Sequence, residues 1–424
     1  MSGTGFSAPI GTRDVLAPES ARWTALLSTF AHVAGQYGYG MVHTPLFEDL
    51  GVFLRMGEAT DVVSKEMYDF EDKGGRHLAL RPEGTASVVR AFVEHRPIVP
   101  WKAWYATPAF RYEKPQAGRY RQHHQVGVEA MGVDDPDMDV EVIALADRYL
   151  RALGAERYLL VLNSMGTLED RQNYDTALRE FLQEVKGDLA EDDQKKVEAN
   201  PRRVLDSKRP ETVAATIDAP RVTDVLADES RERFERVQEG LGSLHIDFAI
   251  GPRLVRGLDY YTHTLFEFQS QALDSAQSTL VGGGRYNGLA EALGGPETPG
   301  IGFGSGIERV LLHLDAEDAF PTPDAGVDAF VVDVTGGRHA RDVSEALRDE
   351  GFAVDRGFDN RSMKAQMKGA NRSGARAAVI IGTDEAAADT VALRDLRGAG
   401  GQQTVDRADL ASHLRTLLET DPSA

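Results

Sequence analysis

The densest group of residues able to do chemistry lies in residues 110–129. Arg111 and Glu113 precede a loop containing Pro and Gly, and Gln125 and Glu129 follow it, so the pattern predicts a strand–turn–strand hairpin. Alternate residues of a strand share one face, and these faces carry Arg, Glu and Gln where a buried sheet would be apolar. An arginine on a rigid strand can hold a phosphate through two hydrogen bonds. A solvated surface hairpin explains any one of these charges, but it does not explain the set.

Two glycine-rich segments come later in the chain. The first, GGGRYNG at residues 282–288, lacks the spacing of a P-loop or of a dinucleotide-binding loop. It lets the backbone approach another group closely, and a plain hairpin turn explains it equally well. The second, GIGFGSGIER at residues 300–309, predicts a strand close under a ligand and then a helix capped by Ser305. Glu308 and Arg309 fall in the first turn of that helix, where anions are attracted. A core helix with a solvated Arg309 is the alternative.

Two shorter segments also carry charged groups beside rigid or aromatic neighbours. In RPEGT, Glu83 stands between Pro and Gly and can receive a cationic amine. A loop before a helix at residues 86–95, capped by Thr85, explains the same residues. In RGLDYYT, Arg256 and Asp259 beside two tyrosines suit a polar planar ligand, and a loop salt bridge between them is the simpler explanation.

The elements that must position these residues follow from hydrophobic periodicity. A charged region with helical spacing, residues 167–245, interrupts the alternation of strands and helices and is interpreted as a helical insertion. Helices are expected at residues 18–37, 86–95 and 137–153, and strands at 41–45, 101–112, 122–131, 157–164 and 253–268.

Prolines and a glycine at residues 321–326 predict a linker to a second domain. Beyond the linker, strands alternate with helices, which predicts a small α/β domain with a mixed sheet. We therefore expect domains at residues 1–325 and 326–424. The expected strands are 329–334, 352–356, 377–382 and 389–395, and the expected helices are 338–349, 362–373 and 407–418.

Charge and composition narrow the function. The 424 residues include 67 acids against 47 Lys and Arg, a net charge of −20, which argues against coating nucleic acid through bulk charge. Residues 101–125 and 355–376 are locally basic, which fits a specific polyanionic partner. The absence of cysteine excludes disulfides and thiolate metal sites. No apolar run reaches the length of a membrane helix, so we expect a cytoplasmic enzyme without a membrane partner.

Taken in order, these segments resemble class II aminoacyl-tRNA synthetases and, most closely, the histidyl-tRNA synthetase family. Residues 110–129 look like motif 2 and residues 300–311 like motif 3, while LRPEGT and RGLDYYT are similar to peptides peculiar to the histidyl enzymes. The resemblance covers nearly the whole chain. It implies an α+β fold: an antiparallel sheet flanked by helices, a helical insertion and a C-terminal α/β anticodon-binding domain. Pro45 looks like the motif 1 proline of the family's dimer interface, which implies a homodimer.

The resemblance also implies a reaction. ATP would activate histidine to histidyl-adenylate and pyrophosphate, and the histidyl group would pass to the 3′ end of tRNA(His). The implied catalytic residues are Arg111, Arg256 and Arg309, whose charges would offset the repulsion between two anions. Mg²⁺ is expected to accompany the ATP phosphates, and no residue is assigned as a metal ligand.

Binding roles follow from the same resemblance. The implied ATP-binding residues are Arg111, Glu113, Arg119, His123 and Arg309. The implied histidine-binding residues are Glu83, Gly84, Thr85, Arg111, Gln125, Glu129, Arg256, Tyr260 and Tyr261. The implied tRNA-binding residues are Gln116 and Arg121 in the hairpin loop, and Lys364, Lys368 and Arg372 on one helix face. One residue departs from the pattern: His123 stands where family members usually place a phenylalanine against the adenine.

Two other functions are compatible with parts of the sequence. Non-catalytic paralogues that regulate ATP phosphoribosyltransferase resemble the catalytic domain, but they lack the anticodon domain and often lose phosphate-holding arginines. Arg111, Arg256 and Arg309 are all present here, which disfavours a paralogue. Other class II synthetases are disfavoured by the RGLDYYT segment.

Overall fold

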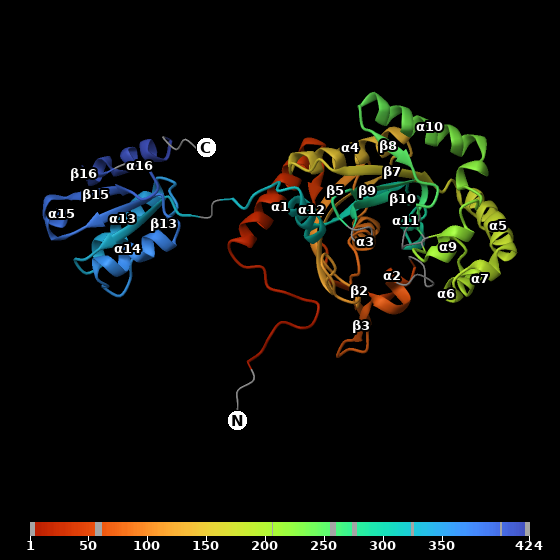
Figure 1. The fold of residues 1–424 in the computed structure, drawn as a ribbon, viewed down its shortest axis with the longest axis horizontal. Coiled ribbons are helices and arrows are strands. Elements are labelled where there is room, and N and C mark those ends of the chain that lie inside the picture. The colour runs from red at the N-terminus through yellow and green to blue at the C-terminus, as the bar shows by residue number, and fades with distance from the viewer. Residues whose placement is uncertain are drawn as a thin grey trace. The chain divides into compact units, whose positions relative to one another are not determined.

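The computed structural model describes residues 5–55, 62–205, 207–254, 260–273, 278–323, 326–398 and 401–419. The chain forms two compact units, Met1–Pro321 and Thr322–Ala424 (Figure 1). Each unit has its own sheet and its own apolar core. Among the described residues, no helix has the length and apolar character needed to cross a membrane.

An eight-stranded sheet forms the centre of the first unit. Its strands stand in the order β1 (Gly40–Met41), β5 (Trp101–Phe110), β6 (Gln122–Met131), β11 (Gly300–Gly306), β10 (Thr279–Arg285), β9 (Thr262–Ser270), β7 (Tyr158–Ser164) and β8 (Phe248–Ile250). The pairs from β5 across to β7 are all antiparallel, whereas β1–β5 and β7–β8 at the two edges are parallel. The predicted α+β class is therefore confirmed, with a mixed sheet whose centre is antiparallel.

Helices cover both faces of this sheet (Figure 1). On one face, α1 (Glu19–Gln36), α4 (Pro136–Ala152) and α12 (Ile307–Ala316) pack on buried residues such as Val126 and Val128. The period of two along β6 then turns Gln125 and Glu129 toward the opposite face. That face carries α3 (Thr85–His95) and α11 (Leu289–Ala292), whose apolar residues pack around Met131 and Tyr286. Beside them lie α2 (Leu50–Leu54) and a small sheet of β2 (Phe47–Asp49), β4 (His77–Leu80) and β3 (Tyr68–Glu71).

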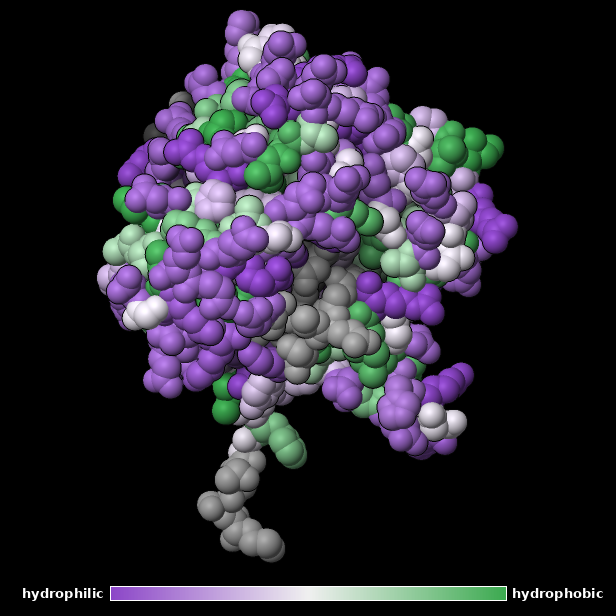
Figure 2. All heavy atoms as spheres, turned by 90° about the vertical axis from the view of Figure 1, so that its right-hand side faces the viewer, coloured by the Kyte–Doolittle hydropathy of each residue, from purple (hydrophilic) through white to green (hydrophobic). Residues whose placement is uncertain are grey.

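The region expected to be a helical insertion contains two long helices, α5 (Leu168–Glu184) and α10 (Asp228–Ser243). Its described residues also form four short ones, α6 (Glu191–Gln194), α7 (Lys196–Ala199), α8 (Arg202–Leu205) and α9 (Pro210–Ala215). The region has a small core of its own, while the apolar residues of α10 pack into the core of the large sheet. Thr167 and Asp170 form a capping box that starts α5. Figure 2 looks onto this side of the molecule; its surface is mostly hydrophilic, with hydrophobic residues in small separate groups.

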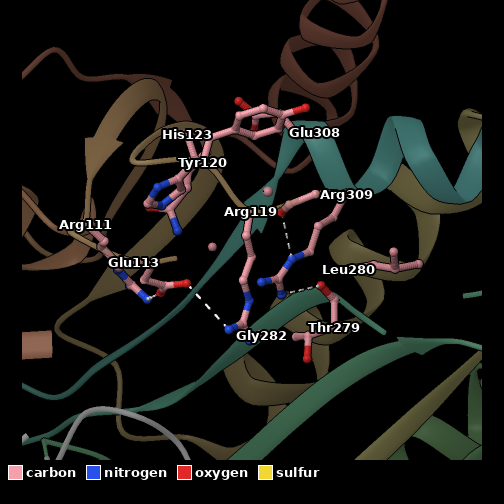
Figure 3. Close-up of a pocket in the computed structure, with 14 residues that line it drawn as sticks. Arg111, Glu113, Arg119, Tyr120, His123, Thr279, Leu280, Gly282, Glu308 and Arg309 are labelled. Carbon is pink, nitrogen blue, oxygen red and sulfur yellow. Dashed lines mark hydrogen bonds and ion pairs between the residues drawn. The ribbon is translucent and has the colours of Figure 1, made fainter. Parts of the chain in front are cut away.

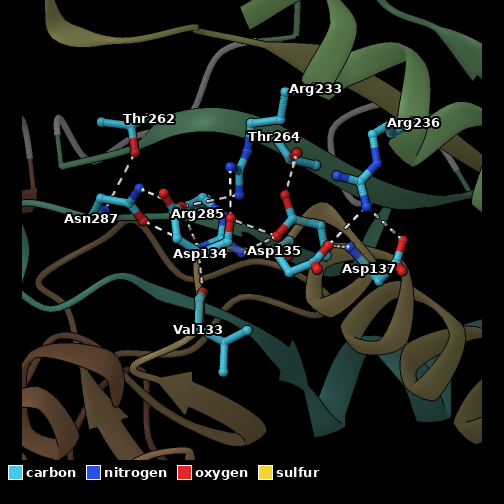
Figure 4. Close-up of polar contacts among 11 residues, drawn as sticks. Val133, Asp134, Asp135, Asp137, Arg233, Arg236, Thr262, Thr264, Arg285 and Asn287 are labelled. Carbon is cyan, nitrogen blue, oxygen red and sulfur yellow. Dashed lines mark hydrogen bonds and ion pairs between the residues drawn. The ribbon is translucent and has the colours of Figure 1, made fainter. Parts of the chain in front are cut away.

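A buried charge network ties this helical region to the sheet (Figure 4). Arg285, at the end of β10, is fully buried; its Nε donates to Asp139 Oδ1 at 2.9 Å, and its Nη1 donates to the Val133 carbonyl at 2.9 Å. Arg233 of α10 donates to the Asp134 carbonyl at 2.8 Å. A buried charge is costly unless it is paired and hydrogen-bonded, so this network locks α10, α4 and β10 together.

The second unit has a five-stranded sheet in the order β13 (Val354–Arg356), β12 (Ala329–Asp333), β14 (Ala377–Ile381), β15 (Thr390–Asp395) and β16 (Gln402–Asp406). The first three strands are parallel and the last two pairings are antiparallel, which confirms the predicted mixed sheet. The helices are α13 (Arg338–Asp349), α14 (Met363–Arg372), α15 (Thr383–Ala388) and α16 (Leu410–Glu419). The sequence analysis missed α15 and β16, because α15 is short and β16 buries only Val405.

Several local expectations were wrong. Ser305 does not cap α12: it lies in β11 and donates to the Leu280 carbonyl at 2.9 Å. Thr85 does not cap α3; instead, the Glu83 carboxylate accepts from the backbone nitrogens of Thr85 (2.7 Å) and Ala86 (2.8 Å). β1 has two residues rather than five, and β5 ends at Phe110, so Arg111 lies beyond the strand.

Candidate active site

One pocket collects the residues assigned to ATP by resemblance (Figure 3). Strands β10 and β11 form its floor. Gly282, Gly304 and Gly306 have no side chains there, so their backbone atoms line the pocket directly. The hairpin between β5 and β6 and the first turn of α12 form its walls. The charged and aromatic lining residues are Arg111, Glu113, Arg119, Tyr120, His123, Glu308 and Arg309.

The arginines of this pocket are held so that their charges face its interior. Glu113 lies between Arg111 and Arg119, with N–O distances of 4.0 Å and 3.6 Å. Arg309 donates to the backbone carbonyls of Gly118 (3.3 Å) and Thr279 (3.4 Å), and Figure 3 shows its guanidinium pointing into the same part of the pocket as that of Arg119. The buried Nε of Arg119 has no hydrogen-bond partner among the described residues. A bound polyphosphate would supply such acceptors.

His123 lines the same pocket, where the charges of two of these cations act on it. Burial, together with the charges of Arg111 and Arg309, holds the pKa of its imidazole well below the usual value. The ring is therefore neutral at physiological pH. A neutral aromatic ring can stack on a base, so the departure from phenylalanine at this position keeps the planar surface.

Glu308 connects the pocket to α1. Its carboxylate accepts from the backbone nitrogen of His124 at 3.0 and 3.1 Å, and it lies 2.9 Å from His124 Nδ1. The His124 ring packs edge-on against Trp23 of α1, with ring centroids 4.8 Å apart. The sequence analysis gave no role to His124 or Trp23, since this contact joins segments far apart in the chain.

Deeper in the unit, a second group of polar side chains is buried on the α3 face of the sheet. Glu129 is fully buried; Tyr286 donates to its Oε2 at 2.5 Å and Tyr105 donates to its Oε1 at 3.4 Å. Burial raises the pKa of Glu129 to about 8. Burial also raises the pKa of Glu83. Two neighbouring carboxyl groups with raised pKa values in one buried site are typical of a place that receives a cationic or hydrogen-bond-donating ligand.

The tyrosines assigned to histidine lie beside these carboxyl groups. The rings of Tyr260 and Tyr261 have centroids 4.6 Å apart, and Tyr260 also packs against Tyr286 at 5.9 Å. Tyr105 and Tyr286 were missed by the sequence analysis. The tyrosine in GGGRYNG was the available signal for Tyr286, whereas Tyr105 is an ordinary strand residue in the sequence.

Glycines make room for this arrangement, which resolves the alternatives left open for the glycine-rich segments. A Cβ on Gly302 would lie 1.9 Å from Glu129 Oε2, and one on Gly84 would lie 2.4 Å from the Tyr105 ring. Gly283 lies in β10 and is not part of a turn; a Cβ there would lie 2.3 Å from the Gly302 carbonyl. The hairpin-turn interpretation of GGGRYNG was therefore wrong.

The remaining predicted residues are distributed as follows. Gln125 lines the arginine-rich pocket on the β6 face that also carries Glu129, and its buried Oε1 lacks a partner among the described residues. Arg256 lies outside the described residues. Gln116 is exposed in the hairpin loop, and Arg121 is half-buried, with its guanidinium 3.9 Å from the Tyr112 ring centroid. Lys364, Lys368 and Arg372 are exposed on α14.

Comparison with models of known protein families decides which family this chain belongs to. A family model described as histidyl-tRNA synthetase matches residues 11–310. The chain belongs to the histidyl-tRNA synthetase family. A second model, described as an anticodon binding domain, matches residues 328–417.

Relatives of this family match over almost the whole length. A histidine–tRNA ligase of Corynebacterium urealyticum is 48% identical over 417 residues, covering 97% of each chain. One of Geobacillus kaustophilus is 47% identical over 424 residues, covering 97% of this chain and 99% of the relative. Apo histidyl-tRNA synthetase of S. aureus has a TM-score of 0.81 at 36% identity, covering 97% of this chain and 100% of that chain.

A more distant solved structure shares the fold alone. An ATP phosphoribosyltransferase regulatory subunit/histidyl-tRNA synthetase of Bacillus halodurans C has a TM-score of 0.66 at 20% identity, covering 90% of this chain and 99% of that chain. The full-length relatives named above are histidine–tRNA ligases, and this chain is accordingly a histidine–tRNA ligase, an aminoacyl-tRNA synthetase.

Proposed function

We propose that this histidine–tRNA ligase activates histidine with ATP in the pocket described above and then transfers the histidyl group to the 3′ end of tRNA(His). The observation that carries this proposal is the arginine-rich pocket of Arg111, Arg119 and Arg309, which shares β6 with the buried carboxyl of Glu129. A phosphate site and an amino acid site on adjacent positions of one strand allow the two substrates to meet. A non-catalytic paralogue would not need the arginines to be retained and held in this way.

In the activation step, the histidine carboxylate attacks the α-phosphate of ATP. Two anions approach each other, so fixed cations lower the barrier by stabilising charge that develops in the transition state. Arg111, held by the Pro82 carbonyl at 2.9 Å, is assigned to the α-phosphate, and Arg309 to the γ-phosphate end. Arg119 and Glu113 are assigned to ATP, and the neutral His123 ring to the adenine. The catalytic role of Arg256 rests on the family resemblance alone.

Mg²⁺ is proposed to bind with the ATP phosphates. The described residues contain no group of three or more His, Asp or Glu side chains suited to a metal ion. Mg²⁺ in phosphate sites is usually held by one or two carboxylates together with the phosphates themselves. Glu113 and Glu308 line the pocket and would hold it. The ion would neutralise phosphate charge.

Histidine is assigned to the buried polar group on the α3 face. Glu83 is proposed to receive the α-ammonium group, with Thr85 and Gln125 beside it. Glu129 and the tyrosines Tyr260 and Tyr261 are proposed to recognise the imidazole ring. A site built to hydrogen-bond both ring nitrogens leaves its own groups unpaired when another amino acid enters, which discriminates by about 10⁴–10⁵ without editing.

A homodimer is proposed from an exposed apolar region around Pro45. Leu46, Phe47 and Phe70 are each more than 40% exposed, and the rings of Phe47 and Phe70 pack together with centroids 6.3 Å apart. Such a group is typical of a protein interface. The tRNA is proposed to contact Gln116 and Arg121 with its acceptor end, and Lys364, Lys368 and Arg372 with its anticodon arm. A cytoplasmic location is proposed because protein synthesis consumes the product.

The test is ATP–pyrophosphate exchange with each of the twenty amino acids in the absence of tRNA, followed by charging of tRNA(His). Exchange that occurs with histidine and with no other amino acid, followed by charging of tRNA(His), supports the proposal. Exchange with a different amino acid would assign another specificity, and a folded protein that exchanges with none would be a non-catalytic paralogue.

A further inference from the structure

An aromatic side chain of the second unit is exposed without a role in the core. Phe358, in the loop between β13 and α14, is 56% exposed, and the guanidinium of Arg356 lies 4.4 Å from its ring centroid. In a second arginine–aromatic pair of this unit, Arg415 lies over Phe352, which is only 9% exposed. The first pair therefore presents a ring to solvent, whereas the second is part of the packed interior.

The loop that carries Phe358 is held firmly. Buried Gln366 donates to the carbonyls of Asp333 and Arg361, both at 2.7 Å, and accepts from the Asp333 nitrogen at 3.0 Å. Gly357 donates to the Val331 carbonyl at 3.0 Å, and a Cβ at this position would lie 2.1 Å from Gln366 Oε1. The exposure of the ring is thus imposed by a built loop that would pre-organise it for binding.

Basic residues follow the ring in the loop and along α14. Besides Arg356, exposed Arg361 follows in the same loop, and exposed Lys364, Lys368 and Arg372 stand on α14. Two carboxylates also lie here: Asp359 pairs with Arg361 at 3.1 Å, and Asp355 accepts from the Arg356 backbone nitrogen at 2.7 Å. Six basic against two acidic residues in residues 355–376 of a chain with net charge −20 marks this surface for a polyanion.

We propose that Phe358, backed by Arg356, is a stacking platform for one unpaired base of the tRNA anticodon loop, while the cations of α14 contact the adjoining phosphates. The proposal rests on the proposed function. Unpaired bases are read chiefly by stacking on aromatic and guanidinium planes, whereas the phosphates are held by charge. The match of residues 328–417 to an anticodon-binding model favours tRNA over a protein partner as the occupant.

The test compares Phe358→Ala and Phe358→Trp with the parent enzyme on two substrates: full-length tRNA(His), and a minihelix that has the acceptor stem but no anticodon arm. Stacking of one base contributes about 1–3 kcal/mol, so Phe358→Ala should raise the KM for full-length tRNA about 5- to 150-fold. The KM for the minihelix and pyrophosphate exchange without tRNA should not change. Phe358→Trp should restore most of the affinity because it retains a planar ring.

Matched controls separate stacking from a general effect on the unit. Arg415→Gln removes the other arginine–aromatic pair and should leave the tRNA KM unchanged, whereas Arg356→Gln should raise it. An unchanged KM in Phe358→Ala overturns the proposal. An equal loss on the minihelix also overturns it, as does a change of oligomeric state, because the ring would then belong to a protein interface. Failure of the proposed function is distinct, since the parent enzyme would then not charge tRNA(His) at all.

Discussion

The phenol of Tyr286 donates a 2.5 Å hydrogen bond to Glu129, and both side chains are almost entirely buried. The preceding residue, Arg285, ends β10 and points the other way, where it pairs with buried Asp139 of α4. Two consecutive residues therefore connect the charge network of the helical region to the buried carboxyl of the candidate histidine site. Displacement of β10 would disturb both at once.

The raised pKa of Glu129 predicts a pH-dependent stability difference between the parent chain and Glu129→Gln. The folded state keeps the proton up to about pH 8, whereas the unfolded state releases it near 4.5. The stabilising contribution of protonated Glu129 is therefore complete below the unfolded pKa and is lost as the pH rises through the folded pKa. Calorimetric melting between about pH 5 and about pH 9 should show that, as the pH rises to about 8, the parent chain loses stability relative to the Gln variant. A difference that does not vary with pH would contradict this prediction.

Tyr286→Phe should weaken histidine binding. The variant removes a hydrogen bond to a buried carboxyl, worth about 1–2 kcal/mol, so the KM for histidine in pyrophosphate exchange should rise about tenfold. The KM for ATP should stay within about twofold. Tyr158→Phe, which removes a 2.8 Å hydrogen bond to Asp147 outside both pockets, serves as the matched control. An equal change of the KM for histidine in the two variants would show that Tyr286 has no particular role in histidine binding.

Arg309→Gln should impair adenylate formation without impairing histidine binding. Loss of one preorganised cation that faces developing charge costs about 10²–10³ in rate. Pyrophosphate exchange measures the rate, and calorimetry with histidine alone measures the amino acid site. Arg341→Gln, in which an exposed arginine paired with Asp342 is changed, should leave both unchanged. Full exchange activity in Arg309→Gln would remove this residue from the mechanism.

His123→Phe should preserve ATP binding. Because the pKa of His123 is held well below its usual value, the ring acts as a neutral plane and does not titrate near neutral pH. The KM for ATP should change by no more than about threefold, and the pH profile of exchange above about pH 6 should match that of the parent enzyme. His123→Ala, which loses the plane, should raise the KM for ATP. A loss of activity near pH 6.5 that disappears in His123→Phe would show that the imidazole does titrate there.

The order of elements and the chemistry-bearing segments could be read from the sequence, because both depend on local patterns. Helix and strand periodicity predicted α1, α4, β6 and most of the second unit close to their observed bounds. The types and spacing of residues around Arg111 and Arg309 predicted charged groups able to hold a phosphate. Each of these features is determined by a few residues close together in the chain, so it could be predicted without knowing which distant segments come into contact.

Only the tertiary structure decided which of these groups meet, because antiparallel pairing brings together strands far apart in the chain. β6 lies beside β11 and β11 beside β10, which places Glu129 against Tyr286 and Gly302. The low pKa of His123 and the high pKa of Glu129 likewise arise from burial and from charges contributed by other segments. The cap of α3 was misassigned because Thr85 is already the first residue of the helix, and the Glu83 side chain accepts from the first two helical nitrogens, those of Thr85 and Ala86. Local sequence sets the residues and their order, whereas desolvation and contacts between distant segments set their ionisation and their partners.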